Sequence, residues 1–197
     1  MHGLVNRSLQ SFLRDTYGRD LWEAVAEDAG VGPDGFEALL SYDDRVTDAV
    51  IDAAAGRLCK PRAALLEDLG SYLAGREGLR RLLRFSGVDY VDFLQSLDEL
   101  PERVHLAVPE LEMPELSLKR IGGGRFTLLC RSPHAGFSAV FAGILRAMAD
   151  DYGALVLIDC EAEDGAGGTI RIELLDAQFA SGRRFDLARP GLGGGGR

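Results

Sequence analysis

The chain is poor in the side chains that most often bind metals and in the patterns that mark enzymes. It has three histidines and three cysteines in 197 residues. Cys59, Cys130 and Cys160 lie far apart and form no CxxC pair, so we expect free thiols in a reducing cytoplasm. No Ser-His-Asp order, phosphate loop or HExxH motif occurs, and the glycines at 122–124 precede an expected strand rather than a helix. The sequence therefore does not favour an enzyme.

Long apolar runs and excess positive charge are also missing. No run approaches the roughly 18 to 20 apolar residues of a membrane span, and the opening MHGLVNRSLQSF is amphipathic, without the apolar core of a signal peptide. The formal net charge of -9 disfavours nucleic acids and anionic membranes as partners. We expect a cytoplasmic protein, and a hydrophobic content of 46% is enough to build a real core.

Helical periodicity fills the first half of the chain. Gly18 is expected to end a first helix and Asp20 to cap a second. Asp43 or Asp44 caps a third that ends at Gly56, and Pro61 opens the next. Further helices are predicted over 76–85 and after Asp89, and a long one over 135–152.

After Pro114 the period changes to alternation, which predicts a hairpin around the glycines at 122–124 and two more strands over 154–160 and 169–175. The fold class is thus α+β, with an N-terminal helical lobe packed on a four-stranded antiparallel sheet that carries one long helix. We expect one domain over 1–188, with a helical lobe at 1–60 and an α/β lobe at 61–188. A flexible glycine-rich tail follows at 189–197. The interface between the lobes is where a ligand pocket is expected.

The segment 93–114 is central to this arrangement. Apolar residues recur in it at helical spacing and predict one inward face: Phe93, Leu94, Leu97, Leu100, Val104 and Val108. Pro101 interrupts the pattern, so the helix either kinks there or stops near Leu100 and restarts with proline in its first turn. His105 lies one turn beyond Pro101 and is expected on the same face.

Five segments follow one another with nearly ungapped family-like spacing: the opening MHGLV, then FLRDTYGRDLWEAVAEDAGV, LLEDLGSYL, VDFLQSLDELP and LLCRSPHAGF. In this order they resemble the heme nitric oxide/oxygen-binding (H-NOX or HNOB) domain, the sensor module of soluble guanylate cyclases and their bacterial relatives. It implies a fold that clasps heme b between the helical lobe and the sheet. Binding of a diatomic gas would be passed to a partner such as a histidine kinase or a cyclic-nucleotide or cyclic-dinucleotide enzyme.

Two departures from the family pattern stand at the heme contacts. The family reads roughly L-D-x-h-H, its histidine being the axial iron ligand, whereas this chain reads LDELP and has Pro101 in that place. Proline offers no side-chain donor to a metal. The family's Tyr-x-Ser-x-Arg, which grips the heme propionates, becomes Cys130, Ser132 and His134, so the bidentate arginine fork is lost. Arg131 is expected to face away from its neighbours.

Several residues remain candidates for the cofactor site. His105 is the best remaining iron ligand if the helix restarts at Pro101, and otherwise is a surface or backbone-bonded histidine. His134 is either a propionate partner or a residue at a helix entry. Cys130 is either a thiolate ligand or a small core hydrophobe. Val5 and Leu9 are expected to border the cofactor slot, and Pro114 matches the family's proline against the porphyrin face.

The sequence leaves two hypotheses open. In the first, the chain is a gas-sensor domain that holds heme b through the displaced ligand His105 and by apolar burial. In the second, it is a heme-free binding or scaffold module. That module keeps the cavity for another apolar ligand, or fills it with side chains such as Val5, Leu9, Leu83 and Phe141.

Overall fold

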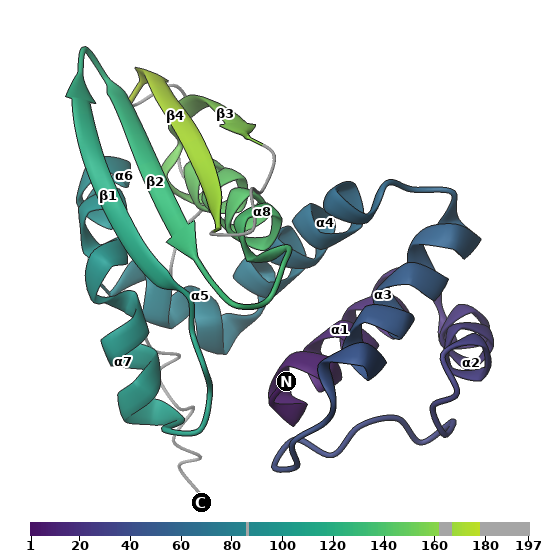
Figure 1. The fold of residues 1–197 in the computed structure, drawn as a ribbon. Coiled ribbons are helices and arrows are strands. Elements are labelled where there is room, and N and C mark those ends of the chain that lie inside the picture. Colours follow the sequence, from purple (N-terminus) through teal and green to yellow (C-terminus); the bar gives the residue numbers. More distant parts are fainter. Residues whose placement is uncertain (86, 162–166, 178–197) are drawn as a thin grey trace, which may run out of the picture.

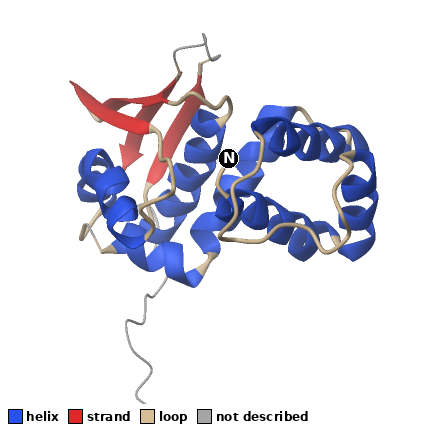
Figure 2. Ribbon diagram, turned by 60° about the horizontal axis from the view of Figure 1, so that its bottom comes forward, coloured by secondary structure: helices blue, strands red, loops and turns tan. Residues whose placement is uncertain are grey.

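The computed structural model describes residues 1–85, 87–161 and 167–177. Within them, a helical lobe stands beside an α/β lobe that carries a four-stranded antiparallel sheet, which confirms the α+β prediction (Figure 1). In Figure 2 the strands lie on the side of the molecule away from the first three helices. The tail at 189–197 lies outside the described residues. No helix in the described ranges has both the length and the apolar character needed to cross a membrane.

The N-terminal lobe contains α1 (Gly3–Tyr17), α2 (Arg19–Asp28) and α3 (Asp44–Leu58). Gly18 separates the first two at a φ of 95°, a conformation that favours glycine. The prediction that Asp20 caps α2 is wrong: Gly18 itself is the cap residue, and Asp20 lies inside the first turn. Asp43, one of the two predicted caps, accepts a hydrogen bond from the Arg45 N–H at the start of α3 (2.9 Å).

The start of α4 (Arg62–Gly75) follows Pro61, as predicted, and this helix joins the two lobes. It crosses α8 (Phe137–Tyr152) with the two backbones in contact. A Cβ placed on Gly70 would lie 1.9 Å from the Val140 carbonyl oxygen, and one on Gly143 would lie 1.9 Å from the carbonyl oxygen of Glu67. Only glycine permits so close an approach at these two positions.

The predicted interruption near Pro101 is a change of helix type. After α5 (Glu77–Arg84), α6 (Tyr90–Gln95) runs into a 3₁₀ turn (Ser96–Glu99), and α7 (Leu100–Ala107) then begins with Pro101 in its first turn. The restart is thus confirmed, because a first-turn proline loses no intrahelical hydrogen bond. Asp89 caps α6 by accepting from the Asp92 N–H (2.9 Å), also as predicted.

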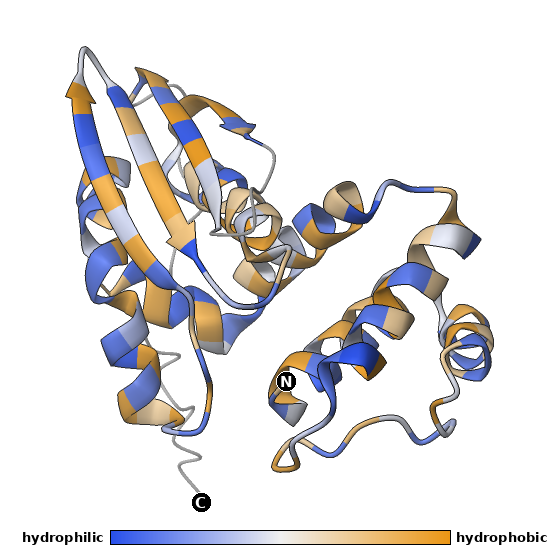
Figure 3. Cartoon of the chain, viewed as in Figure 1, coloured by the Kyte–Doolittle hydropathy of each residue, from blue (hydrophilic) through white to orange (hydrophobic). Residues whose placement is uncertain are grey.

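The sheet has the order β1-β2-β4-β3, with every neighbouring pair antiparallel. Its strands are β1 (Glu115–Gly122), β2 (Arg125–Arg131), β3 (Leu155–Cys160) and β4 (Gly168–Asp176). The glycines between β1 and β2 all have positive φ, which explains why the turn needs them. Figure 3 shows apolar and polar residues alternating along β1, β2 and β4, as expected for strands with one buried face.

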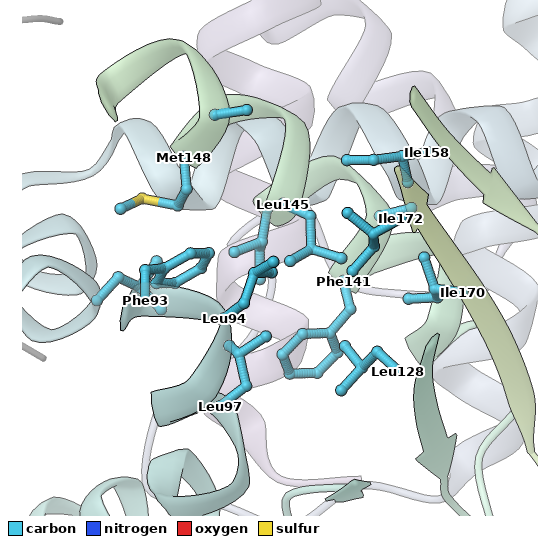
Figure 4. Close-up of a cluster of buried hydrophobic side chains, with 14 of the residues drawn as sticks. Phe93, Leu94, Leu97, Leu128, Phe141, Leu145, Met148, Ile158, Ile170 and Ile172 are labelled. Atoms are coloured by element: carbon cyan, nitrogen blue, oxygen red, sulfur yellow. The ribbon is translucent and has the colours of Figure 1, made fainter. Parts of the chain in front are cut away.

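Two hydrophobic cores hold the lobes. One lies among α1, α2, α3 and the first half of α4. The other lies between the sheet and α6, α7 and α8, where Phe93, Leu94 and Leu97 face Leu128, Phe141, Ile170 and Ile172 (Figure 4). The predicted inward face of 93–108 is confirmed up to Val104, and Val108 is half-buried. Cys130 belongs to this second core and is 1% exposed, so it is the predicted small core residue.

Candidate functional site

An apolar cavity of about 740 Å³ lies between the two lobes, within the usual size range of small-molecule sites. The lobe interface was the predicted place for such a pocket. Its walls come from one face of α1, from α4, α5 and α7, from the loop before β1, and from the start of α8. Most lining side chains are aliphatic or aromatic, among them Leu4, Val5, Leu9, Leu69, Leu73, Leu79, Leu82, Leu83, Leu100, Val104, Val108, Leu111, Met113, Phe137, Val140, Phe141 and Ile144.

The wall contributed by α7 is purely apolar. Leu100 and Val104 line the cavity, one turn apart on the same side of the helix. Pro101, which the resemblance places at the family's iron-ligand position, is half-buried and does not line it. The wall from which an axial imidazole would be expected to project therefore presents only hydrocarbon.

The structure contradicts an inward-facing His105. This residue is exposed and does not line the cavity. It follows Val104 directly, so it points about 100° away from that inward side chain, and it shares the side of Pro101 rather than that of Leu100. As placed, His105 offers no iron ligand, and the surface alternative holds.

His134 lies at the edge of the cavity and contacts carboxylates. Its Nδ1 is 3.2 Å from Oδ2 of Asp44 and its Nε2 is 3.7 Å from Oε2 of Glu112. The other oxygen of Asp44 accepts from the Met1 amino group (2.6 Å). That hydrogen bond, together with the nearby His134, holds the pKa of the Asp44 carboxyl below its usual value. A ring engaged by two carboxylates is poorly placed to receive a propionate.

Cys130 and Ser132, the other two residues that the resemblance places at the propionate site, make different contacts here. Cys130 is enclosed in the second core, and the Ser132 hydroxyl accepts a hydrogen bond from the His134 N–H (3.1 Å), so it holds the turn before α8. Arg131 is exposed on the opposite side of its strand and is paired with Glu115 (3.8 Å), as its strand position predicts.

The apolar residues of the predicted site lie at or next to the cavity wall. Val5 and Leu9 line the cavity from α1. Pro114 is buried, and its neighbour Met113 lines the wall in its place. Leu83 and Phe141 also line the space without filling it, so the cavity is not closed by the bulky side chains that one hypothesis invoked.

Sequence reasoning missed the polar residues of the cavity, above all Tyr72 and Arg76. The Tyr72 hydroxyl donates to Oδ2 of Asp15 (2.5 Å), and burial together with this hydrogen bond raises the pKa of Tyr72 to about 12. Its phenol is thus neutral at physiological pH. The Arg76 guanidinium stacks over the Tyr72 ring (5.5 Å to the centroid) and reaches the same Asp15 oxygen (3.3 Å). Their spacing in the sequence could have predicted this pair, because Tyr72 and Arg76 are four residues apart at the end of α4 and so lie on one face of the helix.

The side chains around the cavity do not fit a heme held in the family's manner. No histidine and no cysteine is among the lining residues, and the described ranges contain no group of three or more His, Cys, Asp or Glu side chains arranged to hold a metal. The sulfur and polar side chains of the lining residues are the thioethers of Met1 and Met113, the carboxylate of Glu112, the guanidinium groups of Arg7 and Arg76, and the hydroxyls of Ser8, Ser11, Thr47 and Tyr72. What remains is a large apolar space with few polar groups.

Comparison with known proteins places the chain in one family. The haem-NO-binding family model matches residues 2–160. Soluble guanylate cyclase 89Da of Drosophila melanogaster is 22% identical over 86% of this chain and 26% of its own length. Soluble guanylate cyclase gcy-31 of Caenorhabditis elegans is 25% identical over 74% of the chain and 21% of its own length. The chain thus spans about a quarter of these curated relatives.

Solved structures show the same fold. An H-NOX protein from S. oneidensis in the Fe(II) ligation state superposes with a TM-score of 0.77 at 17% identity, covering 90% of this chain and 98% of its own. A mutant of the T. Tengcongensis H-NOX gives 0.75 at 18% identity, covering 90% and 99%. With the family model matching most of its length, this chain belongs to the haem-NO-binding, or H-NOX, family of sensor domains.

Proposed function

We propose that this chain is a ligand-sensing signalling domain whose cavity binds an apolar small molecule without imidazole-coordinated iron. Binding of this molecule in the cavity would then be the event that triggers the signal, as gas binding at heme is in the family that the sequence resembles. One observation carries the proposal: a cavity of about 740 Å³ with apolar walls is present, and neither His105, His134 nor any cysteine lines it.

The position of the cavity supports a role in signalling. Its walls come from both lobes, with α1 on one side and α5 and α7 on the other. A ligand in contact with both lobes binds one relative arrangement of them more tightly than others, and so shifts the population toward it. This is how filling an apolar space can be converted into a change of shape that a partner reads.

The class of partner is inferred only from similarity to known proteins. The curated relatives are soluble guanylate cyclases that are about four times as long as the matched segment. We therefore propose a cyclase-type signalling enzyme or a histidine kinase as the recipient of the signal.

A heme-based gas sensor is the second candidate, and the family match favours it. Because His105 is exposed, an iron ligand would have to come from the lining residues themselves. Met113 is the best of these, since its thioether lines the wall next to Pro114. Methionine is an axial ligand in some heme proteins, in those cases paired with histidine.

A paired titration tests the proposal. The full chain is titrated with 1-decanol by calorimetry and, separately, with hemin by absorbance. The proposal predicts saturable 1:1 binding of the alcohol and no stoichiometric hemin complex with an imidazole-type spectrum. Stoichiometric hemin binding together with no alcohol binding would overturn it in favour of the gas sensor.

A further inference from the structure

The cavity runs beside α1, and the two ends of that helix have different polar surroundings. At its start, the Met1 amino group, Asp44, His134 and Glu112 gather, and two of these groups are carboxylates. At its end, Asp15 is held by Tyr72 and Arg76. At about 1.5 Å per helical residue the two ends are roughly 20 Å apart, so a ligand in the cavity meets different charges at its two ends.

Arg76 is the positive group of the cavity wall at the second end. It lines the space together with Tyr72, whereas Asp15 does not line it. Its guanidinium has five N–H donors, and among the described residues the only acceptor it reaches is Asp15, at 3.3 Å. That oxygen of Asp15 already receives the shorter hydrogen bond from Tyr72 (2.5 Å). Donors of Arg76 are therefore available to a second anion.

We infer that the natural ligand of this cavity is a single-chain amphiphile with an anionic head, of the fatty-acid class, whose carboxylate pairs with Arg76. The apolar chain lies against Leu73, Leu79, Leu82 and the other aliphatic residues of the wall. This inference rests on the proposed function and adds the chemical class and the orientation of the ligand.

The opposite orientation is disfavoured by charge. A carboxylate placed at the start of α1 would face Glu112, which lines the cavity, and Asp44 beside it. The cation of that half of the wall, Arg7, is directed to the Phe36 carbonyl oxygen (3.4 Å). The negative charges of the ligand and of these two carboxylates would repel one another. The positive Met1 amino group and the His134 ring nearby already contact the carboxylates. An arginine, by contrast, presents a planar fork that matches a carboxylate. The head group is thus directed to Arg76 and away from the turn that corresponds to the family's propionate site.

The test compares decanoate with 1-decanol, which share a chain and differ at the head. Both are titrated by calorimetry into the full chain at pH 7.5. We expect decanoate to bind about tenfold more tightly, the size expected of one charge-assisted hydrogen-bonded pair. The variant Arg76→Gln should remove this tenfold preference and leave the affinity for 1-decanol unchanged. The control Arg19→Gln, at an exposed position of α2 outside the cavity, should keep the preference.

A second comparison tests the apolar part. Each methylene removed from the chain should weaken binding roughly fourfold while it still contacts the wall. Equal affinity for decanoate and 1-decanol, or a preference that survives Arg76→Gln, overturns the inference while leaving the proposed function standing. Failure of both probes to bind overturns the proposed function itself.

Discussion

The Nδ1 atom of His134 lies 3.2 Å from Oδ2 of Asp44, and this contact joins the turn before α8 to the first turn of α3. Asp44 also accepts from the Met1 amino group, and His134 also approaches Glu112 at 3.7 Å. Segments distant in sequence therefore meet through one histidine at the edge of the cavity. The resemblance puts the family's propionate-binding arginine at this position, whereas here the His134 side chain connects the two lobes.

A double-mutant cycle measures the interaction free energy between His134 and Asp44. We expect His134→Ala and Asp44→Ala each to lower the free energy of unfolding by about 0.5–1 kcal/mol, because the pair is only partly shielded from water. The double variant should lose less than the sum of the two, since the pair can be broken only once. Chemical denaturation of the four proteins gives the coupling. Strict additivity would show that the contact contributes nothing.

The decrease in the free energy of unfolding at acid pH depends in part on Asp44. The hydrogen bond from Met1 holds the pKa of this carboxyl below its ordinary value of 3.8 in the folded chain, so the unfolded state binds more protons in that range. Its contribution to stability is then fully present above about pH 4 and is lost as the pH falls through the lower, folded-state pKa. Denaturation between about pH 2.5 and 5 should show a shallower acid slope in Asp44→Asn than in the unaltered protein. An unchanged slope would count against the contact.

The crossing of α4 and α8 depends on Gly143. An alanine there would place its Cβ 1.9 Å from the Glu67 carbonyl oxygen, so the helices must separate. We expect Gly143→Ala to cost at least about 2–3 kcal/mol of unfolding free energy. The matched control is Gly56→Ala in α3, where nothing lies within 4 Å of the new methyl group. That variant should gain about 0.5–1 kcal/mol from helix propensity. Similar effects at both sites would contradict the close crossing.

The empty volume beside α7 can be filled. Val104→Phe should extend into the cavity, weaken binding of 1-decanol at least tenfold, and leave the unfolding free energy within about 1 kcal/mol, because the added ring displaces no packed side chain. Leu128→Phe is the matched control, since Leu128 is fully buried in the packed second core. There the same kind of enlargement should cost about 1–3 kcal/mol. If both variants lose stability equally, the cavity is not a real void.

Much of the fold follows from sequence patterns, because local signals and packing agree. Pro101 predicted the restart of a helix, and the alternation after Pro114 predicted the strands. Asp20 misled because an aspartate suits the first turn of a helix as well as its cap, and the conformationally permissive Gly18 took the cap position.

The candidate site was harder to predict. The sequence left open whether His105 faces the cavity or the surface, because its side of α7 is set by the tertiary packing of Leu100 and Val104, and the structure places it at the surface. Val5 and Leu9 line the cavity because they lie on the apolar face of α1, and their contact with a cofactor stays a prediction. The pairing of His134 with Asp44 joins residues far apart in sequence, and no local pattern encodes such a contact.

The most direct test is a hemin titration of the purified full chain followed by absorbance, repeated with His105→Ala. We predict that the unaltered protein forms no stoichiometric complex with a histidine-ligated heme spectrum, and that His105→Ala behaves identically. A tight 1:1 complex with such a spectrum, lost in His105→Ala, would contradict this and show that the exposed imidazole turns inward to bind iron.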